Sequence, residues 1–476
     1  MDVPATRFVC AGCGRALQVG ELPFACPAAR PGDDVDHVLA RIDVTPEALA
    51  FPGDTERHAN PFIHYRRLLH PYHVAIAGGL SDAVFVALVE RLDHEITHVE
   101  RPGHGFRITP LERRHDLDVW AKDETDNVSG SHKARHLMGI LVYLEVLDAI
   151  GHGASAATVG RPLAIASCGN AALAASVVAR AGRRRLRVFV PVDAHPAVLE
   201  RLAELGALIE VCERRPGESG DPTYRRFQEE VAAGALPFAC QGPASGLTID
   251  GGRTLGYEIV EELVRHDRQL DHLVVQVGGG ALGSALAQSF DDAVRLGMLE
   301  RLPAMHFVQT RGAYPLAEAY HRLSSVMAAR GGAAGAAQDV GDWLAEATGH
   351  RGRYMFPWPL TPHSVAHGIL DDETYDWCAL VGAMRRSGGT TVVVDEATLL
   401  EANRLANDPV HRPVHRAGRS RALALVDETG SAGLAGVLAL RRSGVIAEGE
   451  RTCVIFSGAR RCRPEAPEAQ VLSEVG

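Results

Sequence analysis

One lysine, Lys133, stands among small polar residues in the stretch 122–136, KDETDNVSGSHKARH. Gly130 and Ser131 precede it and Ala134 follows it, which leaves room beside its amine for a planar ligand. Partial burial favours the uncharged form of an amine, which is a nucleophile toward an aldehyde. A serine cap followed by a solvated lysine is also an ordinary way to start a helix. Taken alone, the stretch leaves both interpretations open.

Three other loops follow apolar segments and carry small or polar residues. Residues 167–172, SCGNAA, come after LAIA and open an alanine-rich helix, whose N-terminal N–H groups can hold a carboxylate. A tight turn that needs glycine explains them equally well. Residues 278–283, GGGALG, come after LVVQV, and such glycines let backbone N–H groups cradle a phosphate, although a lone glycine run is weak support. Ser457 follows TCVIF and places a hydroxyl at the carboxyl end of a strand, where wound sheets bind ligands.

One ligand and its reaction partner together have a chemical group for each of these features. An aldehyde suits the lysine amine, a phosphate suits the glycines, and a polar ring atom suits the hydroxyl. The remaining loop suits a carboxylate on a second molecule. Pyridoxal phosphate together with an amino acid meets this description, so we expect this cofactor and a small-molecule amino-acid substrate.

The pattern of strands and helices predicts how these loops are held. From residue 107 onward, short apolar strands alternate with amphipathic helices, which is typical of a wound, largely parallel α/β sheet. We predict the α/β class, with two wound parallel-sheet subdomains and the cofactor between them, in a catalytic domain of residues 107–465. Residues 41–106 indicate a helical lead-in, in which Ser81 caps a helix, and residues 466–476 form a tail.

The first 40 residues resemble a zinc ribbon that has lost one ligand. Two cysteines are spaced as CAGC, a third opens CPAA, and Ala29 stands where the last cysteine would be. A structural zinc ion needs four thiolate or imidazole ligands, so the loop must fold back to supply a histidine. Two interpretations stay open: a degenerate ribbon without an ion, or zinc bound by Cys10, Cys13, Cys26 and His37.

The overall composition excludes some partners. The chain has 476 residues, a formal net charge of -10 and a pI near 6.1, so nothing supplies the broad basic face that binds nucleic acid. The amino terminus has no basic segment followed by an apolar core, and no apolar run approaches the ~20 residues of a membrane span. Nine cysteines, an odd number, fit free thiols better than a disulfide framework. We expect a cytoplasmic protein. A homodimer is the oligomeric state that we consider for it.

In their order and wording, these stretches resemble the fold type II pyridoxal-phosphate enzymes, the family of threonine synthase, threonine and serine dehydratases, serine racemase and the tryptophan synthase β chain. The resemblance covers residues 107–462 and includes DGGRTLGYEI at 250–259 and SVAHGI at 364–369. It implies that Lys133 is the Schiff-base lysine and that Ser457 faces the pyridine nitrogen. It also implies a substrate-binding loop of Ser167, Cys168, Gly169, Asn170 and Ala171, with Asn170 on the phenolic oxygen, and a phosphate site of Gly278, Gly279, Gly280, Ala281 and Leu282.

Three features depart from the family pattern. His132 stands where the family usually has an aromatic residue, and Asp427-Glu428 stands where it has glutamate-proline. Residues 311–362, with the Ala/Gly-rich run 328–337, are longer than the family needs and are expected to be a surface insertion. These departures leave the substrate open.

The hydroxyl of Ser457 favours one reaction class. A pyridine nitrogen that meets a neutral hydroxyl is not held protonated, so the ring is a weaker electron sink and elimination of a β-leaving group follows quickly after α-proton removal. Lys133, once released by the substrate amine, is placed to take that proton. We expect a threonine/serine dehydratase-like deaminating lyase. The alternatives are a threonine synthase-like or other β- or γ-replacement enzyme and, from a different class, a non-catalytic pyridoxal-phosphate-binding protein.

Overall fold

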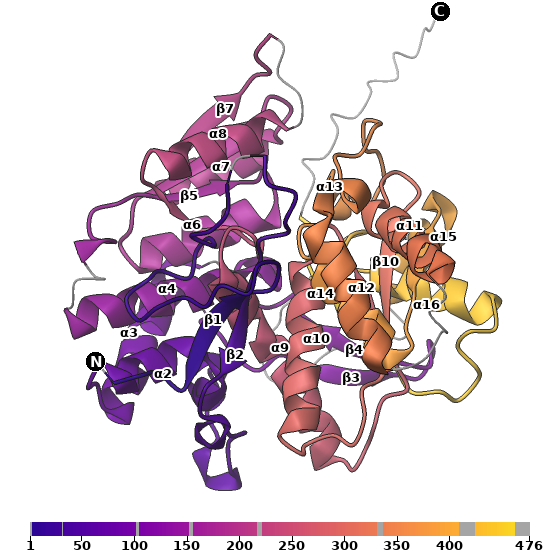
Figure 1. Cartoon of the computed structure of the whole chain (residues 1–476), viewed down its shortest axis with the longest axis horizontal. Helices are drawn as coiled ribbons and strands as arrows, with labels where there is room; N and C mark the ends of the chain where they lie inside the picture. The colour runs from indigo at the N-terminus through magenta and orange to yellow at the C-terminus, as the bar shows by residue number, and fades with distance from the viewer. Residues whose placement is uncertain are drawn as a thin grey trace, which may run out of the picture.

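The computed structural model describes residues 2–30, 32–100, 104–151, 156–216, 221–330, 337–408 and 424–461. Two parallel sheets, each covered by helices, form two lobes that lie side by side (Figure 1). This arrangement confirms the predicted α/β class with two wound subdomains. The predicted tail, residues 466–476, lies outside the described residues.

The larger sheet has six strands in the order β11-β10-β9-β12-β4-β3, and only β3 runs antiparallel to its neighbour. In the register, Val454 on β12 lies opposite Ala121 on one side and Val274 on the other. All three side chains are buried, as expected of a parallel sheet with helices on both faces. The strands are β3 (Leu111–Arg114), β4 (Val119–Asp123), β9 (His272–Gln276), β10 (Ala304–Thr310), β11 (Thr391–Val394) and β12 (Thr452–Phe456).

The smaller sheet has four parallel strands in the order β7-β6-β5-β8. Its central strands have apolar, fully buried centres, and helices α6 and α8 pack on it. The strands are β5 (Leu163–Ala166), β6 (Leu186–Pro191), β7 (Leu208–Cys212) and β8 (Leu236–Pro237). The helices of this lobe are α3 (Asp82–Val99), α4 (Lys133–Ile150), α6 (Asn170–Ala181), α7 (Pro196–Glu204) and α8 (Pro222–Ala232).

Helix α9 (Gly246–Arg265) joins the two lobes, because it packs against α4 on one side and α10 on the other. Its residues 246–260 are all buried, which explains its four glycines: a Cβ on Gly251, for example, would lie 2.5 Å from the Arg135 carbonyl oxygen. The helices around the larger sheet are α10 (Ala281–Arg295), α11 (Pro315–Ala329), α12 (Ala337–Gly349), α13 (Arg351–Tyr354), α14 (Trp377–Ser387), α15 (Glu396–Ala406) and α16 (Ala432–Arg442).

The expectation of a surface insertion at residues 311–362 is wrong. Helix α11 buries Leu316 and Leu323, α12 buries Trp343, and α13 buries Tyr354, all in the same apolar cluster as the larger sheet. The helices are amphipathic, so their apolar faces need the core as a partner. Of the Ala/Gly-rich run, residues 331–336 lie outside the described part of the chain.

The amino-terminal segment forms a small antiparallel sheet of β1 (Thr6–Cys10) and β2 (Leu39–Asp43) at the junction of the lobes (Figure 1). Strand β2 continues to Asp43, three residues past the predicted boundary at residue 40. After it come α1 (Pro61–His64), α2 (His70–Ala77) and α3, whose N-cap is Ser81 as expected. Short 3-10 helices are η1 (Pro46–Ala48), η2 (Asp54–Glu56), η3 (Arg66–Leu68), η4 (Val128–Gly130) and η5 (His367–Ile369).

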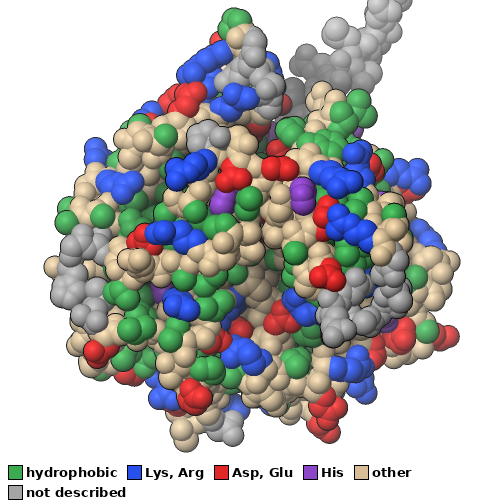
Figure 2. All heavy atoms as spheres, viewed as in Figure 1, with side chains coloured by type: hydrophobic (Ala, Val, Ile, Leu, Met, Phe, Trp, Pro, Cys, Tyr) green, Lys and Arg blue, Asp and Glu red, His purple; other side chains and the backbone are tan. Residues whose placement is uncertain are grey.

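The surface shown in Figure 2 carries acidic and basic side chains interspersed with one another. Among the described residues, no helix is both long and apolar enough to cross a membrane.

Candidate active site

Lys133 is the first residue of α4 and is half-buried. The turn before it contains two successive left-handed residues, Ser129 with φ 58° and Gly130 with φ 65°. A non-glycine residue rarely adopts such a φ, so the surrounding structure must hold this turn. Ser131 forms an isolated bridge with Gly458, which follows β12. The lysine is therefore fixed beside the carboxyl end of a strand that lies more than 300 residues later in the sequence.

The chain has only two lysines, Lys122 and Lys133, and only the second has a free amine. The Lys122 amine, 1% exposed, donates to the Thr109 carbonyl oxygen at 2.6 Å and pairs with Glu258. The Lys133 amine makes no hydrogen bond within the described part of the chain. An aldehyde that binds a lysine of this protein therefore has one chemically available partner.

A buried ion-pair network lies under the Lys133 turn. The guanidinium of Arg135 on α4 donates to both carboxylate oxygens of Glu124, at 2.8 and 2.9 Å, and also pairs with Glu258 on α9. All three side chains are 0% exposed. Burial alone would raise the pKa of Glu124, but the Arg135 charge outweighs burial and lowers that pKa to about 2. The network ties β4, α4 and α9 together and so holds the start of α4 in place.

Ser457 lies directly after β12 and is 3% exposed. Its hydroxyl accepts a hydrogen bond from Gln276 Nε2 at 2.7 Å. The same nitrogen donates to the carbonyl oxygens of Gly430 and Ile455, at 3.0 and 3.1 Å. Because carbonyl oxygens only accept, they fix which atom of the Gln276 amide is the nitrogen. The Ser457 proton is therefore free to point away from Gln276, toward a ligand that accepts a hydrogen bond.

His132 closes this part of the site. Its backbone N–H donates to the Ser457 carbonyl oxygen at 3.1 Å, and its ring Nδ1 lies 3.0 Å from the same oxygen. A carbonyl oxygen only accepts hydrogen bonds, so the ring must carry a proton on Nδ1. Burial, and then the nearby Lys133 charge, lower the pKa of His132 well below its usual value, which agrees with a neutral ring.

The loop of residues 167–170 ends β5 and begins α6, which has no side-chain cap, so the first N–H groups of this helix are available to an anion. The loop reaches the other lobe through Arg461, whose guanidinium donates to Asn170 Oδ1 at 3.0 Å and to the Ser129 carbonyl oxygen at 3.3 Å. With Oδ1 engaged, the Asn170 amide nitrogen remains to donate to a ligand. A Cβ on Gly458 would lie 3.0 Å from that nitrogen, so glycine permits the close approach.

The glycine loop, residues 278–280, leads from β9 into α10, which also lacks a side-chain cap. Gly280 has φ 100°, a backbone conformation that favours glycine. A Cβ on Gly278 would lie 2.3 Å from Asp371 Oδ2, and one on Gly279 would lie 2.9 Å from the Tyr375 ring. The segment of residues 371–376 therefore packs directly on the glycine loop.

Two carboxyl groups of this segment have raised pKa values. Burial raises the pKa of Asp371 to about 6 and that of Asp376 to about 7, while the Lys133 charge opposes both shifts. The Gly279 amide also opposes the shift of the Asp371 pKa, because it favours the ionised carboxylate.

The four predicted loops are brought together, because Lys133, Asn170, the glycine loop and Ser457 are joined by the contacts described above. Their roles toward a ligand stay predictions. Sequence reasoning missed Gln276 and Asp371. A polar residue inside the apolar strand LVVQV was a signal for Gln276, and Asp371 comes two residues after the quoted stretch SVAHGI.

The arrangement fits pyridoxal phosphate. A free amine, a glycine loop that leads into an uncapped helix, and a buried hydroxyl with an available proton match the aldehyde, phosphate and ring nitrogen of that cofactor. The uncapped start of α6 remains for a substrate carboxylate.

Several known enzymes share this fold. A family model described as pyridoxal-phosphate dependent enzyme matches residues 100–458. A threonine synthase of Methanocaldococcus jannaschii is 22% identical over 368 residues, which are 75% of this chain and 76% of that protein. Threonine deaminase isoform 2 of Solanum lycopersicum aligns with TM-score 0.53 and 16% identity, over 80% of this chain and 90% of its own. Diaminopropionate ammonia lyase of Escherichia coli aligns with TM-score 0.53 and 14% identity, over 78% and 88%.

Proposed function

Because the chain belongs to the family of pyridoxal-phosphate-dependent enzymes, we propose that it is a lyase that deaminates an amino acid carrying a leaving group on its β-carbon. The observation that carries the proposal is the pair of Lys133, the one lysine with a free amine, and Ser457, a neutral hydroxyl with an available proton. The names of solved structures with this fold, among them threonine deaminase and ammonia lyases, support the same reaction class.

When bound, pyridoxal phosphate supplies an aldehyde for amines and a conjugated ring that draws electrons from the substrate α-carbon. Lys133 would hold this aldehyde, and the amides of the glycine loop would hold the phosphate. Ser457 would donate its proton to the ring nitrogen, since Gln276 already donates to the Ser457 oxygen. A ring nitrogen left neutral in this way would favour prompt loss of a β-leaving group.

The substrate is held by the loop of residues 167–171. The N–H groups at the start of α6 bind its carboxylate, and the amine of Lys133, once released, removes the α-proton. Asp371, near both Lys133 and the glycine loop, gives a proton to a poor leaving group such as hydroxide. A carboxyl group with a pKa near 6 suits this task, because it is protonated often enough at neutral pH and still gives its proton readily.

A threonine synthase-like replacement reaction is the second candidate, favoured by the sequence similarity to the Methanocaldococcus jannaschii enzyme. The two differ in product. A deaminating lyase releases the α-amino group as ammonia and the carbon skeleton as a 2-oxo acid, whereas a replacement enzyme returns a new amino acid.

A screen of amino acids with β-hydroxyl and β-amino groups tests the proposal on the cofactor-loaded protein. We expect ammonia and 2-oxo acid from at least one of them, in a ratio of one to one from a β-hydroxyl substrate or two to one from a β-amino substrate, and neither product with Lys133→Ala. A new amino acid would instead support replacement, and an inverted α-carbon would support racemisation. A bound cofactor that reacts with no amino acid would support a binding protein.

A further inference from the structure

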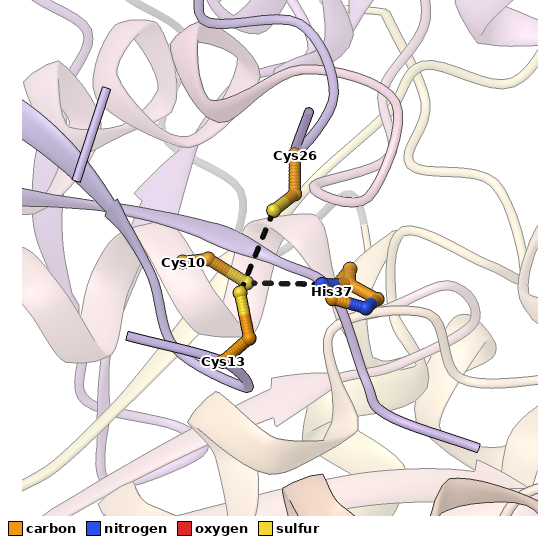
Figure 3. A group of neighbouring side chains, drawn as sticks. All are labelled: Cys10, Cys13, Cys26 and His37. Carbon is orange, nitrogen blue, oxygen red and sulfur yellow. Dashed lines mark hydrogen bonds between the residues drawn. The ribbon is translucent and has the colours of Figure 1, made fainter. Parts of the chain in front are cut away.

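Four metal-ligating side chains lie close together at the end of β1, in the loop that follows it and just before β2 (Figure 3). The ligand atoms of Cys10, Cys13, Cys26 and His37 all lie within 4.8 Å of one another. The pairing of β1 with β2, in which Cys10 lies opposite Leu39, places His37 beside the CAGC turn. A Cβ on Gly12 would lie 2.3 Å from the Asp36 carbonyl oxygen, so this turn packs directly on the residues before β2.

The separations match a tetrahedral site. The sulfurs of Cys13 and Cys26 are 3.7 Å apart, and the Cys10 sulfur is 3.4 Å from His37 Nδ1. A tetrahedral zinc ion at its usual bond lengths holds two thiolates about 3.8 Å apart and a thiolate about 3.6 Å from an imidazole nitrogen. The other ligand atoms lie within 4.8 Å of one another, so small side-chain shifts are enough to close the four groups around one ion.

The contact between Asp33 and the Nε2 of His37 determines which ring nitrogen can bind a metal. His37 Nε2 lies 2.9 Å from Asp33 Oδ2. An ionised carboxylate only accepts hydrogen bonds, so Nε2 carries the proton and the lone pair is on Nδ1, the nitrogen that faces the sulfurs. A carboxylate behind a histidine is the usual support for a metal-bound imidazole.

The residues between Cys26 and His37 also contact α13 of the larger lobe. The Asp34 carbonyl oxygen accepts from the Arg351 backbone N–H at 2.8 Å, and Asp34 Oδ1 accepts from the Gly352 N–H at 2.6 Å. The Arg351 guanidinium donates to Asp36 at 3.1 Å and also pairs with Glu373. Glu373 belongs to the segment of residues 371–376, which packs on the glycine loop.

We propose that Cys10, Cys13, Cys26 and His37 bind one structural zinc ion, which fixes residues 33–36 against α13 and so supports the segment over the glycine loop. Four protein ligands leave no open position, so the ion has a structural role. Where other ribbons have a fourth cysteine, this chain has Ala29, and His37 supplies the fourth ligand instead.

Metal analysis of the full, untagged protein tests the site. We expect one zinc ion per chain in the wild type, less than a tenth of that in Cys13→Ser, and an unchanged amount in Cys212→Ser, which removes a buried cysteine of β7. In Asp33→Asn, the affinity for zinc should fall 10- to 100-fold, because the imidazole loses its carboxylate support. After exchange of zinc for Co²⁺, thiolate-bound Co²⁺ should absorb at wavelengths longer than those of pyridoxal phosphate.

Hydrogen exchange tests the link to the larger lobe. Removal of zinc should speed the exchange of the amides of Arg351 and Gly352, while the amides of β7 exchange as before. Wild-type protein without bound zinc, a disulfide between Cys13 and Cys26, or unchanged exchange at α13 after zinc removal would each overturn the proposal.

Discussion

Replacing Arg135 with methionine should strongly destabilise the protein, because Arg135 is the partner of two fully buried carboxylates. The variant removes the cation that pairs directly with Glu124 and leaves Glu258 paired with Lys122. The pKa of Glu124 is about 2, against 4.5 without its surroundings, and this difference corresponds to about 3 kcal/mol of stabilisation. Loss of one member of a buried ion pair costs about 3–5 kcal/mol, which agrees with that figure.

The pH dependence gives a second, independent expectation. The folded-state pKa of Glu124 lies below its unfolded value, so its stabilisation is complete above pH ~4.5 and is lost as the pH falls toward ~2. The difference between wild type and Arg135→Met should therefore be largest at neutral pH. At pH 4 it should be about 1 kcal/mol smaller, because Glu124 is then largely protonated in the unfolded chain.

Urea unfolding of the cofactor-loaded proteins at both pH values measures these differences. Arg91→Met is the matched control, since Arg91 pairs at the surface with Glu145 and such pairs contribute about 0–1 kcal/mol. If Arg135→Met lost no more stability than Arg91→Met, or lost the same amount at both pH values, the account of the network would be refuted.

Three further variants test the site. Gly278→Ala would place a Cβ 2.3 Å from Asp371 Oδ2, so it should lower the affinity for the cofactor at least tenfold. Gly341→Ala is the control, because there is open space around its Cβ, and it should leave the affinity unchanged. Absorbance of the bound cofactor after dialysis measures both. Asp371→Asn should slow ammonia release from serine about 100-fold or more. Ammonia release from β-chloroalanine should hardly change, because chloride leaves without a proton. Equal effects on both substrates would contradict the role of Asp371. Ser457→Asp should protonate the ring nitrogen and, with substrate, give a new species that absorbs at longer wavelength. Ser457→Ala should lose only one hydrogen bond to the ring, of about 1 kcal/mol. Identical behaviour of the two variants would mean that Ser457 is not at that nitrogen.

The strand ends of the site could be predicted because parallel strands in a covered sheet are apolar throughout. The segments TCVIF and LAIA are strands β12 and β5 with the expected bounds, and LVVQV is shifted by one residue from β9. The loops that follow them are short, so their residues necessarily lie at the same sheet edges. Local sequence therefore contained most of the information needed to name these loops.

Contacts between distant segments could not be predicted in this way. Asp371 meets the glycine loop only because residues 371–376 fold back over β9, and nothing near Gly278 in sequence indicates that. The Ala/Gly-rich composition of residues 328–337 suggested a surface insertion, whereas the amphipathic pattern of the flanking helices, with Leu323 and Trp343 on their buried faces, was the better guide. The boundary at residue 40 cut β2 because its pairing with β1 spans the whole cysteine loop.

The bond between Lys133 and the cofactor is the central claim, and borohydride reduction tests it most directly. Reduction of the cofactor-loaded protein, followed by proteolysis and mass spectrometry, should find the phosphopyridoxyl group on Lys133, which is one of only two lysines in the chain. The group should remain on Lys133 in Lys122→Arg and be absent from Lys133→Ala. A phosphopyridoxyl group on Lys122, or none on Lys133 in protein that has bound the cofactor, would contradict the account.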